Sequence, residues 1–161
     1  MHPKFPHLFS PIRIGHREAR NRTMRLATVT NTGANGTVSA RTIDHYRAIA
    51  RGGTGAIVTE AMRAHPSNAG RAAAMLLYSP EILPGLTRLA EAVHGEGALL
   101  VAQINHGGRQ HHAHEIPTVW GPSAIACPQS GGVPHAMTRS EIAEVVEGFA
   151  TAAFQIGRAH V

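Results

Sequence analysis

Three short segments with the residue types of strands alternate along the chain with longer segments of helical periodicity. The strand-like segments are residues 22–29, 55–61 and 98–104, and the last two are almost entirely apolar. Between them, apolar residues recur every three or four positions, as they do on one face of a helix. Apolar strands that alternate with helices are typical of a parallel sheet covered on both faces. The pattern therefore predicts an α/β fold.

Capping signals indicate where the helices begin. Ser39 and Ser79 each precede a periodic segment, and Thr138 with Glu141 fits a capping box before a third. Residues 8–20 predict a small hairpin ahead of the first strand, so the expected order is a hairpin followed by about three βα units. The apolar positions expected to face the core are Ile43, Tyr46 and Ala50 in the first helix, Leu86, Leu89, Ala90 and Val93 in the second, and Ile142, Val145, Val146, Phe149 and Ala153 in the third.

Two arrangements of such units fit the pattern, a part of a (β/α)₈ barrel and an open flavodoxin-like sheet. With 161 residues the chain is too short for a closed barrel, which needs about 250. The open sheet would need more strands than the pattern contains, and a phosphate-binding loop between a strand and a helix. The glycine-rich residues 52–55 instead precede a strand. A partial barrel is therefore favoured, and its unclosed sheet would leave an open apolar edge.

Composition and charge limit the classes of binding partner that the sequence predicts. The net charge is +5, but the arginines are scattered and Lys4 is the only lysine, so no basic patch or recognition motif predicts nucleic-acid binding. No apolar run approaches the ~20 residues of a membrane span, and the N-terminus lacks the apolar core of a signal peptide. The single cysteine, Cys127, fits a reducing compartment and is interpreted as incidental rather than reactive. We expect a cytoplasmic protein without nucleic-acid or membrane partners.

Polar or small residues follow each predicted strand, at Ala27-Thr28, at Glu60-Ala61 and from Gln103 onwards. In parallel α/β folds, ligands bind at the carboxyl ends of the strands, so these positions should converge on one site. The carboxamide of Gln103 offers an acceptor and a donor in one plane, which matches the pyrimidine edge of a flavin. An equal alternative is that Gln103 only satisfies the backbone of a loop.

Residues 105–138 form a long loop rich in histidine, glycine and proline. Histidine is the commonest metal ligand, so a metal-binding protein using the His106–His114 loop is one alternative function. The histidines lack the regular spacing of a helix-borne pair, however, and a solvated loop or substrate-facing lid is favoured. We expect no metal. The residues considered as ligands are His106, His111, His112, His114 and Glu115.

Residues 103–109 read Gln-Ile-Asn-His-Gly-Gly-Arg and directly follow an apolar strand. Together with residues 8–14, 21–22, 52–61 and 121–125, in this order, the block resembles Old Yellow Enzyme-like NADH:flavin oxidoreductases, the 2,4-dienoyl-CoA reductase family. The resemblance runs from about Phe5 to Phe154. It implies a partial TIM (β/α)₈ barrel over residues 5–155. It also implies a flavoprotein oxidoreductase with FMN as cofactor and NADH or NADPH as reductant.

In that family, flavin N5 transfers hydride to the substrate, here expected to be an activated alkene or an amine, as in ene-reductases, dienoyl-CoA reductases and amine demethylases. The chain departs from the family pattern at Ala27, where proline is common, and at Val29, where threonine or cysteine tunes the flavin. These departures predict a changed redox potential rather than loss of the cofactor. The resemblance assigns a substrate-facing position to Asn31 and His106, although structural support of the loop is an equal role for His106. It assigns cofactor binding to Leu26, Ala27, Thr28, Val29, Ala61 and Gln103.

The family's substrate-binding histidines, its proton-donating tyrosine and its phosphate contacts lie on later strands than this chain contains. We therefore interpret the chain as an N-terminal fragment, inactive in isolation, with its catalytic residues unknown. Residues 156–161 resemble a translated sequencing adapter and are predicted to be a non-native tail. The alternative to an enzyme part is a non-enzymatic half-barrel that covers its open edge by forming a homo-oligomer.

Overall fold

The computed structural model describes residues 4–111, 116 and 118–161. An antiparallel hairpin, β1 (Ile12–Ile14) and β2 (Arg17–Ala19), precedes a parallel sheet in the order β3 (Met24–Arg25), β4 (Ala56–Arg63) and β5 (Leu99–Asn105). Helices α1 (Ala40–Arg51), α2 (Leu83–Gly95) and α3 (Arg139–Arg158) follow the three strands in turn. The connections contain 3₁₀ helices η1 (Pro66–Asn68), η2 (Pro80–Ile82) and η3 (Gly108–Gln110) and a parallel pair, β6 (Trp120–Gly121) with β7 (His135–Ala136). The predicted hairpin and three βα units are confirmed.

The helices begin where their capping residues predict. The Ser39 hydroxyl accepts the N–H of Thr42 at 3.1 Å, and Ser79 caps η2, which leads directly into α2. At the start of α3, Glu141 N–H donates to the Thr138 hydroxyl and Thr138 N–H donates to the Glu141 carboxylate. Each side chain therefore satisfies backbone donors that the first turn of a helix leaves unpaired.

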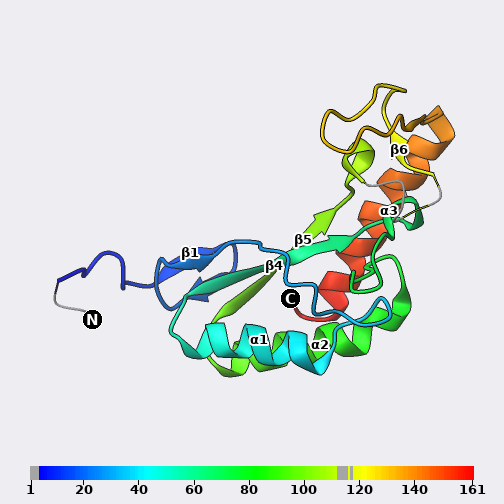
Figure 1. The fold of residues 1–161 in the computed structure, drawn as a ribbon. Coiled ribbons are helices and arrows are strands. Elements are labelled where there is room, and N and C mark those ends of the chain that lie inside the picture. The colour runs from blue at the N-terminus through cyan, green and yellow to red at the C-terminus, as the bar shows by residue number, and fades with distance from the viewer. Residues whose placement is uncertain (1–3, 112–115, 117) are drawn as a thin grey trace.

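The core lies between one face of the sheet and helices α1 and α2, which run side by side along that face (Figure 1). The predicted inward positions of α1 and α2 are confirmed. Burial of each large apolar side chain contributes about 1.5–3 kcal/mol, so this layer fixes how the strands lie on the helices. Its central members are Tyr46 and Ala50 from α1, Ile57 and Met62 from β4, Leu86, Leu89, Ala90 and Val93 from α2, and Leu100 from β5.

The predicted first strand is much shorter than residues 22–29, because only Met24 and Arg25 pair with β4. Beyond Arg25 the chain runs without ladder bonds to Gly33. Its backbone N–H groups at Thr30 and Asn31 donate to the side chain of Glu60 rather than to a strand carbonyl. A buried carboxylate thus anchors the end of this segment, which the local sequence of the strand does not reveal.

Helix α3 buries a different face from the predicted one. Of the expected stripe, Ile142 and Val146 are 44% and 63% exposed. The helix instead buries Gly148, Ala152 and Gln155. Gly148 lies against the chain that follows β4, and the helix also contacts α2 and β5. A Cβ at residue 148 would lie 2.6 Å from the Ala64 carbonyl, so small side chains allow a close approach that bulky ones prevent.

The helix α3 continues through residue 158, and Ala159 is fully buried in the core. The prediction that residues 156–161 are non-native concerns the gene, and it stays a prediction. No helix among the described residues is long and apolar enough to cross a membrane.

The hairpin closes the amino ends of the strands. Arg20 donates through Nη1 to the Glu96 carbonyl at 2.8 Å and also binds the Thr54 and Ala50 carbonyls. The buried Asn21 donates from Nδ2 to the Gly53 carbonyl at 2.7 Å. These bonds join the hairpin to the turns that end α1 and α2. The carboxyl ends of the strands, at the opposite edge, carry the candidate site.

Candidate functional site

The site is built on the sheet face that α1 and α2 do not cover. In the parallel pairing of β4 with β5, Ala61 lies opposite Gln103, and Arg63 lies opposite Asn105. Residues two apart on a strand point to the same face. These four side chains therefore share one face, at the carboxyl ends of the strands. The structure brings Ala61 and Gln103 together, as the parallel-strand pattern predicts.

A bulge in β4 decides which residues face the site. Val58 lies opposite Val101 and Ala61 opposite Gln103, so β4 has one residue more than β5 between these pairs. The Thr59 hydroxyl accepts the Gln103 N–H at 3.1 Å and donates to the Glu60 carbonyl at 3.0 Å. The side chain of Thr59 thus makes the contact to β5 that a regular ladder would make through the backbone.

Glu60 holds the segment after β3 in place. Glu60 is only 4% exposed. Its carboxylate accepts hydrogen bonds from the N–H groups of Thr30 at 3.1 Å and Asn31 at 3.2 Å, and from the Thr30 hydroxyl. Hydrogen bonds to an ionised carboxylate are about twice as strong as neutral ones. Asn31 adopts a left-handed backbone, with φ of 52°, at this contact. The position of residues 26–31 therefore depends on Glu60.

Tyr46 supports Glu60 from α1. Its hydroxyl accepts the Glu60 N–H at 2.6 Å, and burial raises the pKa of this hydroxyl above its ordinary value. Sequence reasoning placed Glu60 at a strand end but missed its role in holding residues 30 and 31. The available signal was an acidic residue in an otherwise apolar strand, because buried acids are rarely left without partners.

The predicted cofactor-binding residues lie on two sides of the same region. Leu26 and Val29 are 66% and 55% exposed in the segment that Glu60 holds, and Ala27 and Thr28 lie between them. Gln103 is exposed on β5, and within the described residues its carboxamide makes no hydrogen bond. The alternative in which the Gln103 side chain satisfies a loop backbone therefore receives no support.

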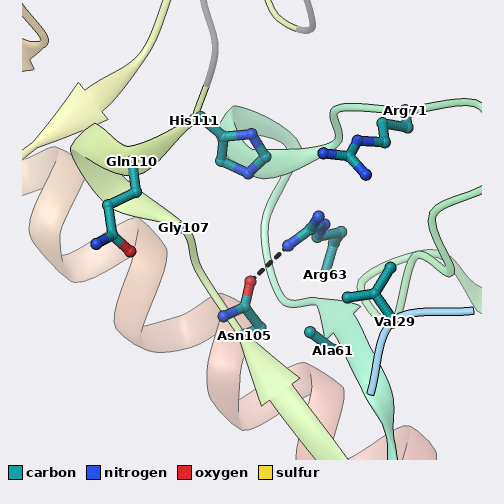
Figure 2. Close-up of a pocket in the computed structure, with 8 residues that line it drawn as sticks. All are labelled: Val29, Ala61, Arg63, Arg71, Asn105, Gly107, Gln110 and His111. Atoms are coloured by element: carbon teal, nitrogen blue, oxygen red, sulfur yellow. Dashed lines mark hydrogen bonds between the residues drawn. The ribbon is translucent and has the colours of Figure 1, made fainter. Parts of the chain in front are cut away.

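Figure 2 shows a hollow beyond these strand ends. Its volume of about 240 Å³ is below the roughly 300–1,000 Å³ of a complete small-molecule site, so these residues form part of one. Arg63 donates from Nη1 to the Asn105 Oδ1 at 2.5 Å inside it. Asn31, predicted to face substrate, lines an adjoining hollow with Glu60. The lining residues of the first hollow are Val29, Ala61, Arg63, Arg71, Asn105, Gly107, Gln110 and His111.

His106 lies outside this lining and binds the turn after β4. Its Nδ1 accepts the Gly108 N–H at 3.1 Å, and its Nε2 lies 2.9 Å from the Ser67 hydroxyl. That hydroxyl lies 2.8 Å from Nδ1 of His65, which also accepts the Ser67 N–H. Burial lowers the pKa of His106 to about 4, and repulsion between its protonated form and the side chains of His65, His111 and Arg63 contributes in the same direction.

These contacts determine the direction of the bonds. Since Nδ1 of His106 is an acceptor and the ring is neutral at pH 7, its proton resides on Nε2. His106 then donates to Ser67, and Ser67 donates to His65, whose pKa burial also lowers. His106 therefore joins the loops that follow β4 and β5. The substrate-facing role predicted for it stays a prediction.

Among the described residues, no group of three or more His, Cys, Asp or Glu side chains could hold a metal ion. His112, His114 and Glu115 of the predicted histidine cluster lie outside the described residues. Cys127 is buried, at 3% exposed.

Comparison with known proteins gives consistent matches. The model of the NADH:flavin oxidoreductase / NADH oxidase family matches residues 7–159. The NADH oxidase of Thermoanaerobacter brockii is 38% identical over 154 residues, which are 92% of this chain and 24% of the relative. A 2-naphthoyl-CoA reductase complex matches with a TM-score of 0.91 at 34% identity, over 96% of this chain and 26% of that one. The Old Yellow Enzyme homologue from Zymomonas mobilis matches with a TM-score of 0.84 at 26% sequence identity, over 96% of this chain and 46% of that one.

The chain thus spans about a quarter to a half of the length of these proteins. The solved relatives are TIM barrels, so the expectation of a partial (β/α)₈ barrel is confirmed and the open flavodoxin-like sheet was the wrong alternative. The resemblance to Old Yellow Enzyme-like oxidoreductases is confirmed as well. The matches point to FMN and NAD(P)H as the cofactors of the family.

Proposed function

The chain belongs to the NADH:flavin oxidoreductase / NADH oxidase family, and on that premise we propose that its strand ends form the ring-binding part of an FMN site. The pairing of Ala61 with Gln103 on the uncovered face of the sheet carries this proposal. The methyl group of Ala61 leaves room for a planar ring to approach the strand. The carboxamide of Gln103 offers the donor and acceptor that a pyrimidine edge requires.

The segment of residues 26–29 completes the proposed site. Glu60 holds the next two residues, so Leu26 to Val29 would contact the ring from a fixed position, mainly through backbone groups. Ala27 and Val29 place methyl groups where relatives often have a proline ring and a hydroxyl or thiol. The environment of the ring is therefore less polar, which shifts its redox potential and leaves binding intact.

The whole protein is proposed to be an FMN-dependent NAD(P)H oxidoreductase. Bound FMN would supply hydride transfer at N5, while the residues of this chain bind and orient the ring. The solved relative with a TM-score of 0.91 is a 2-naphthoyl-CoA reductase, which favours an unsaturated, activated substrate over an amine. A cytoplasmic location, and the absence of nucleic-acid and membrane partners, stay predictions from the sequence.

Flavin titration of the purified chain tests the proposal. Without added flavin the chain is expected to be colourless, since it spans only part of the relatives. Added FMN should shift the NMR signals of the Gln103 carboxamide and the Ala61 amide. Gln103→Ala removes two hydrogen bonds of about 1 kcal/mol each, so FMN affinity should fall about 30-fold. Gln129→Ala, an exposed loop glutamine, is the matched control. Equal FMN affinity of the two variants would contradict the proposal.

A second candidate is a non-enzymatic half-barrel that pairs with another copy of itself. The exposed apolar side chains of α3, including Val146 at 63% and Phe154 at 66%, favour it. Sedimentation velocity distinguishes the two candidates. A dimer that Val146→Glu converts to a monomer, and that shows no flavin-dependent shifts, supports the half-barrel.

A further inference from the structure

We propose that Asn105 is a specificity-determining residue, whose carboxamide presents a hydrogen-bond donor of fixed direction to the hollow beyond Ala61. Such a donor selects a substrate that carries an uncharged acceptor, such as a carbonyl oxygen, beside its reacting atoms. Arg63 is the positioning residue that sets the direction of this donor. The inference rests on the proposed function, because it assumes that the hollow lies beside the bound ring.

The orientation of the Asn105 carboxamide is determined by its neighbour on β4. Arg63 lies opposite Asn105 in the parallel register, and its Nη1 donates to Oδ1 at 2.5 Å. A guanidinium has donors and no acceptor, so only the oxygen of the carboxamide can face it. The amino group therefore turns the other way, and Figure 2 shows Nδ2 on the side where Gln110 lies. A carboxamide can ordinarily present either of its ends, but the contact with Arg63 leaves one orientation.

The backbone of Asn105 is held by the loop that follows β4. Its carbonyl accepts the Ala64 N–H at 3.0 Å and the Asn68 Nδ2 at 3.0 Å. Asn68 is fully buried at the end of η1, so its position is fixed by the fold. A side chain that is already ordered loses little conformational freedom when a ligand binds to it. The Asn105 donor is thus preorganised from two directions, its backbone and its carboxamide oxygen.

The donor itself is available to a ligand. Within the described residues, Nδ2 of Asn105 donates no hydrogen bond, and the residue is half-buried. A partly buried donor without an acceptor is costly, and a bound acceptor would remove that cost. A ligand group that is itself a donor would instead leave two donors facing each other, so the site would reject it.

The hollow places this donor next to the proposed ring-binding residues. Val29 and Ala61 line it together with Asn105. An acceptor that Nδ2 holds would therefore lie next to the ring, where a substrate reacts. The carbonyl oxygens of the flavin ring are the competing acceptors. An experiment on Asn105 has to distinguish a substrate oxygen from these ring oxygens.

The test uses uncharged probes and no flavin, so that it is independent of the proposed function. Cyclohexanone carries only an acceptor and pyrrole carries only an N–H donor, and each is titrated into the chain while NMR follows the Asn105 carboxamide. Cyclohexanone should give a saturable shift and bind more tightly than pyrrole. Asn105→Asp keeps an oxygen for Arg63 but replaces the donor by an acceptor. One hydrogen bond is then lost with cyclohexanone and one is gained with pyrrole, each changing affinity about fivefold, so the ratio of the two affinities should fall about 25-fold. Gln129→Glu, the same change of amide to acid in an exposed loop, is the matched control and should leave the ratio unchanged.

Variants of Arg63 test its positioning role. Arg63→Met provides no donor, so the Asn105 carboxamide can turn its oxygen toward the hollow, and pyrrole should bind about fivefold more tightly than it binds the unmodified chain. Arg63→Lys can still donate to Oδ1 and should retain the original preference. A loss of packing at residue 63 would weaken both probes, whereas the expected result is a gain for one of them.

Three results would overturn this assignment. The first is that cyclohexanone leaves the Asn105 carboxamide signals unshifted, and the second is that Asn105→Asp and Gln129→Glu change the affinity ratio equally. The third is that FMN shifts the Asn105 carboxamide and that Asn105→Asp lowers FMN affinity as much as Gln103→Ala does, because Asn105 would then bind the ring. Failure of FMN to shift the Gln103 signals, with cyclohexanone binding intact, would count against the proposed function alone.

Discussion

The two hydrogen bonds of His106 can be removed one at a time, and the structure predicts unequal costs. An asparagine at residue 106 has an oxygen where the imidazole has Nδ1, so it can still accept the N–H two residues ahead in an Asx turn. It is too short to reach Ser67, whose hydroxyl lies 2.9 Å from Nε2 of the ring. A glutamine has the opposite properties. It can reach Ser67 but provides no acceptor for the Gly108 N–H, which the ring binds at 3.1 Å.

The expected magnitudes follow from what each variant leaves unpaired. His106→Asn removes one bond between side chains, and Ser67 keeps His65 as a partner, so the cost is about 1 kcal/mol. His106→Gln leaves a partly buried backbone N–H without its acceptor, which costs about 1–3 kcal/mol. His106→Ala loses both bonds and should cost about 2–4 kcal/mol. The predicted order of destabilisation is therefore Asn, then Gln, then Ala.

Urea unfolding at pH 7, followed by circular dichroism, measures these differences as changes in the free energy of unfolding at constant m-value. His16→Asn, in the exposed turn of the hairpin, is the matched control and should change stability by less than about 0.5 kcal/mol. If His106→Gln proves as stable as His106→Asn, the assigned direction of the hydrogen bonds is wrong. A ¹⁵N spectrum showing the His106 proton on Nδ1 would refute the reasoning directly.

Three further predictions concern the fold around the site. The pKa of His106 is lowered to about 4, so the unfolded chain binds more protons between pH 4 and about 6.5, and stability should fall as pH drops through that window. The loss should be about 1–2 kcal/mol after allowance for the partial exposure of the ring, measured by urea unfolding at each pH and diminished in His106→Asn. Gly148→Ala should destabilise the chain by about 1–2 kcal/mol, because the new Cβ would meet the Ala64 carbonyl. Gly157→Ala, in the same helix with open space around it, should instead stabilise the chain by about 0.5–1 kcal/mol. Equal effects of the two variants in thermal unfolding would disprove the close approach. Glu60→Ala should raise the amide exchange rates of Thr30 and Asn31 at least tenfold, and exposed Glu91→Ala should not; unchanged protection would mean that Glu60 does not hold this segment.

Local signals made much of the fold predictable. Ser39 and the Thr138–Glu141 pair satisfy the backbone of their own helices, so a few adjacent residues suffice to locate each helix start. The length of β3 was not predictable in this way. The chain beyond Arg25 leaves the sheet, and its far end is held by Glu60, thirty residues away, whose carboxylate accepts the backbone N–H groups of Thr30 and Asn31. The buried face of α3 was missed for a related reason, since periodicity marks where apolar residues lie but not how closely two backbones approach at Gly148.

In the candidate site, too, some features follow from the local sequence and others from tertiary contacts. Ala61 and Gln103 could be placed together from the sequence, because parallel strands end at one edge of a sheet. The role of Glu60 could not, because it depends on which way a strand turns at its bulge and on how residues 30 and 31 return to its carboxylate. Those features are tertiary, and no local pattern encodes them.

The bulge at Thr59 connects these observations, because it sets the charge of the site. In a regular ladder continuing from the Val58–Val101 pair, Glu60 would lie opposite Gln103 and Met62 opposite Asn105. A carboxylate would then occupy the ring-binding position, and Ala61 and Arg63 would point to the side of the helices. The one extra residue reverses this arrangement, so that Ala61 and Arg63 face the site while Glu60 is buried against Tyr46 and residues 30 and 31. A single inserted position thus supplies the small residue, the cation and the anchored segment together. Deletion of Thr59 should therefore weaken flavin binding more than any single substitution within the site.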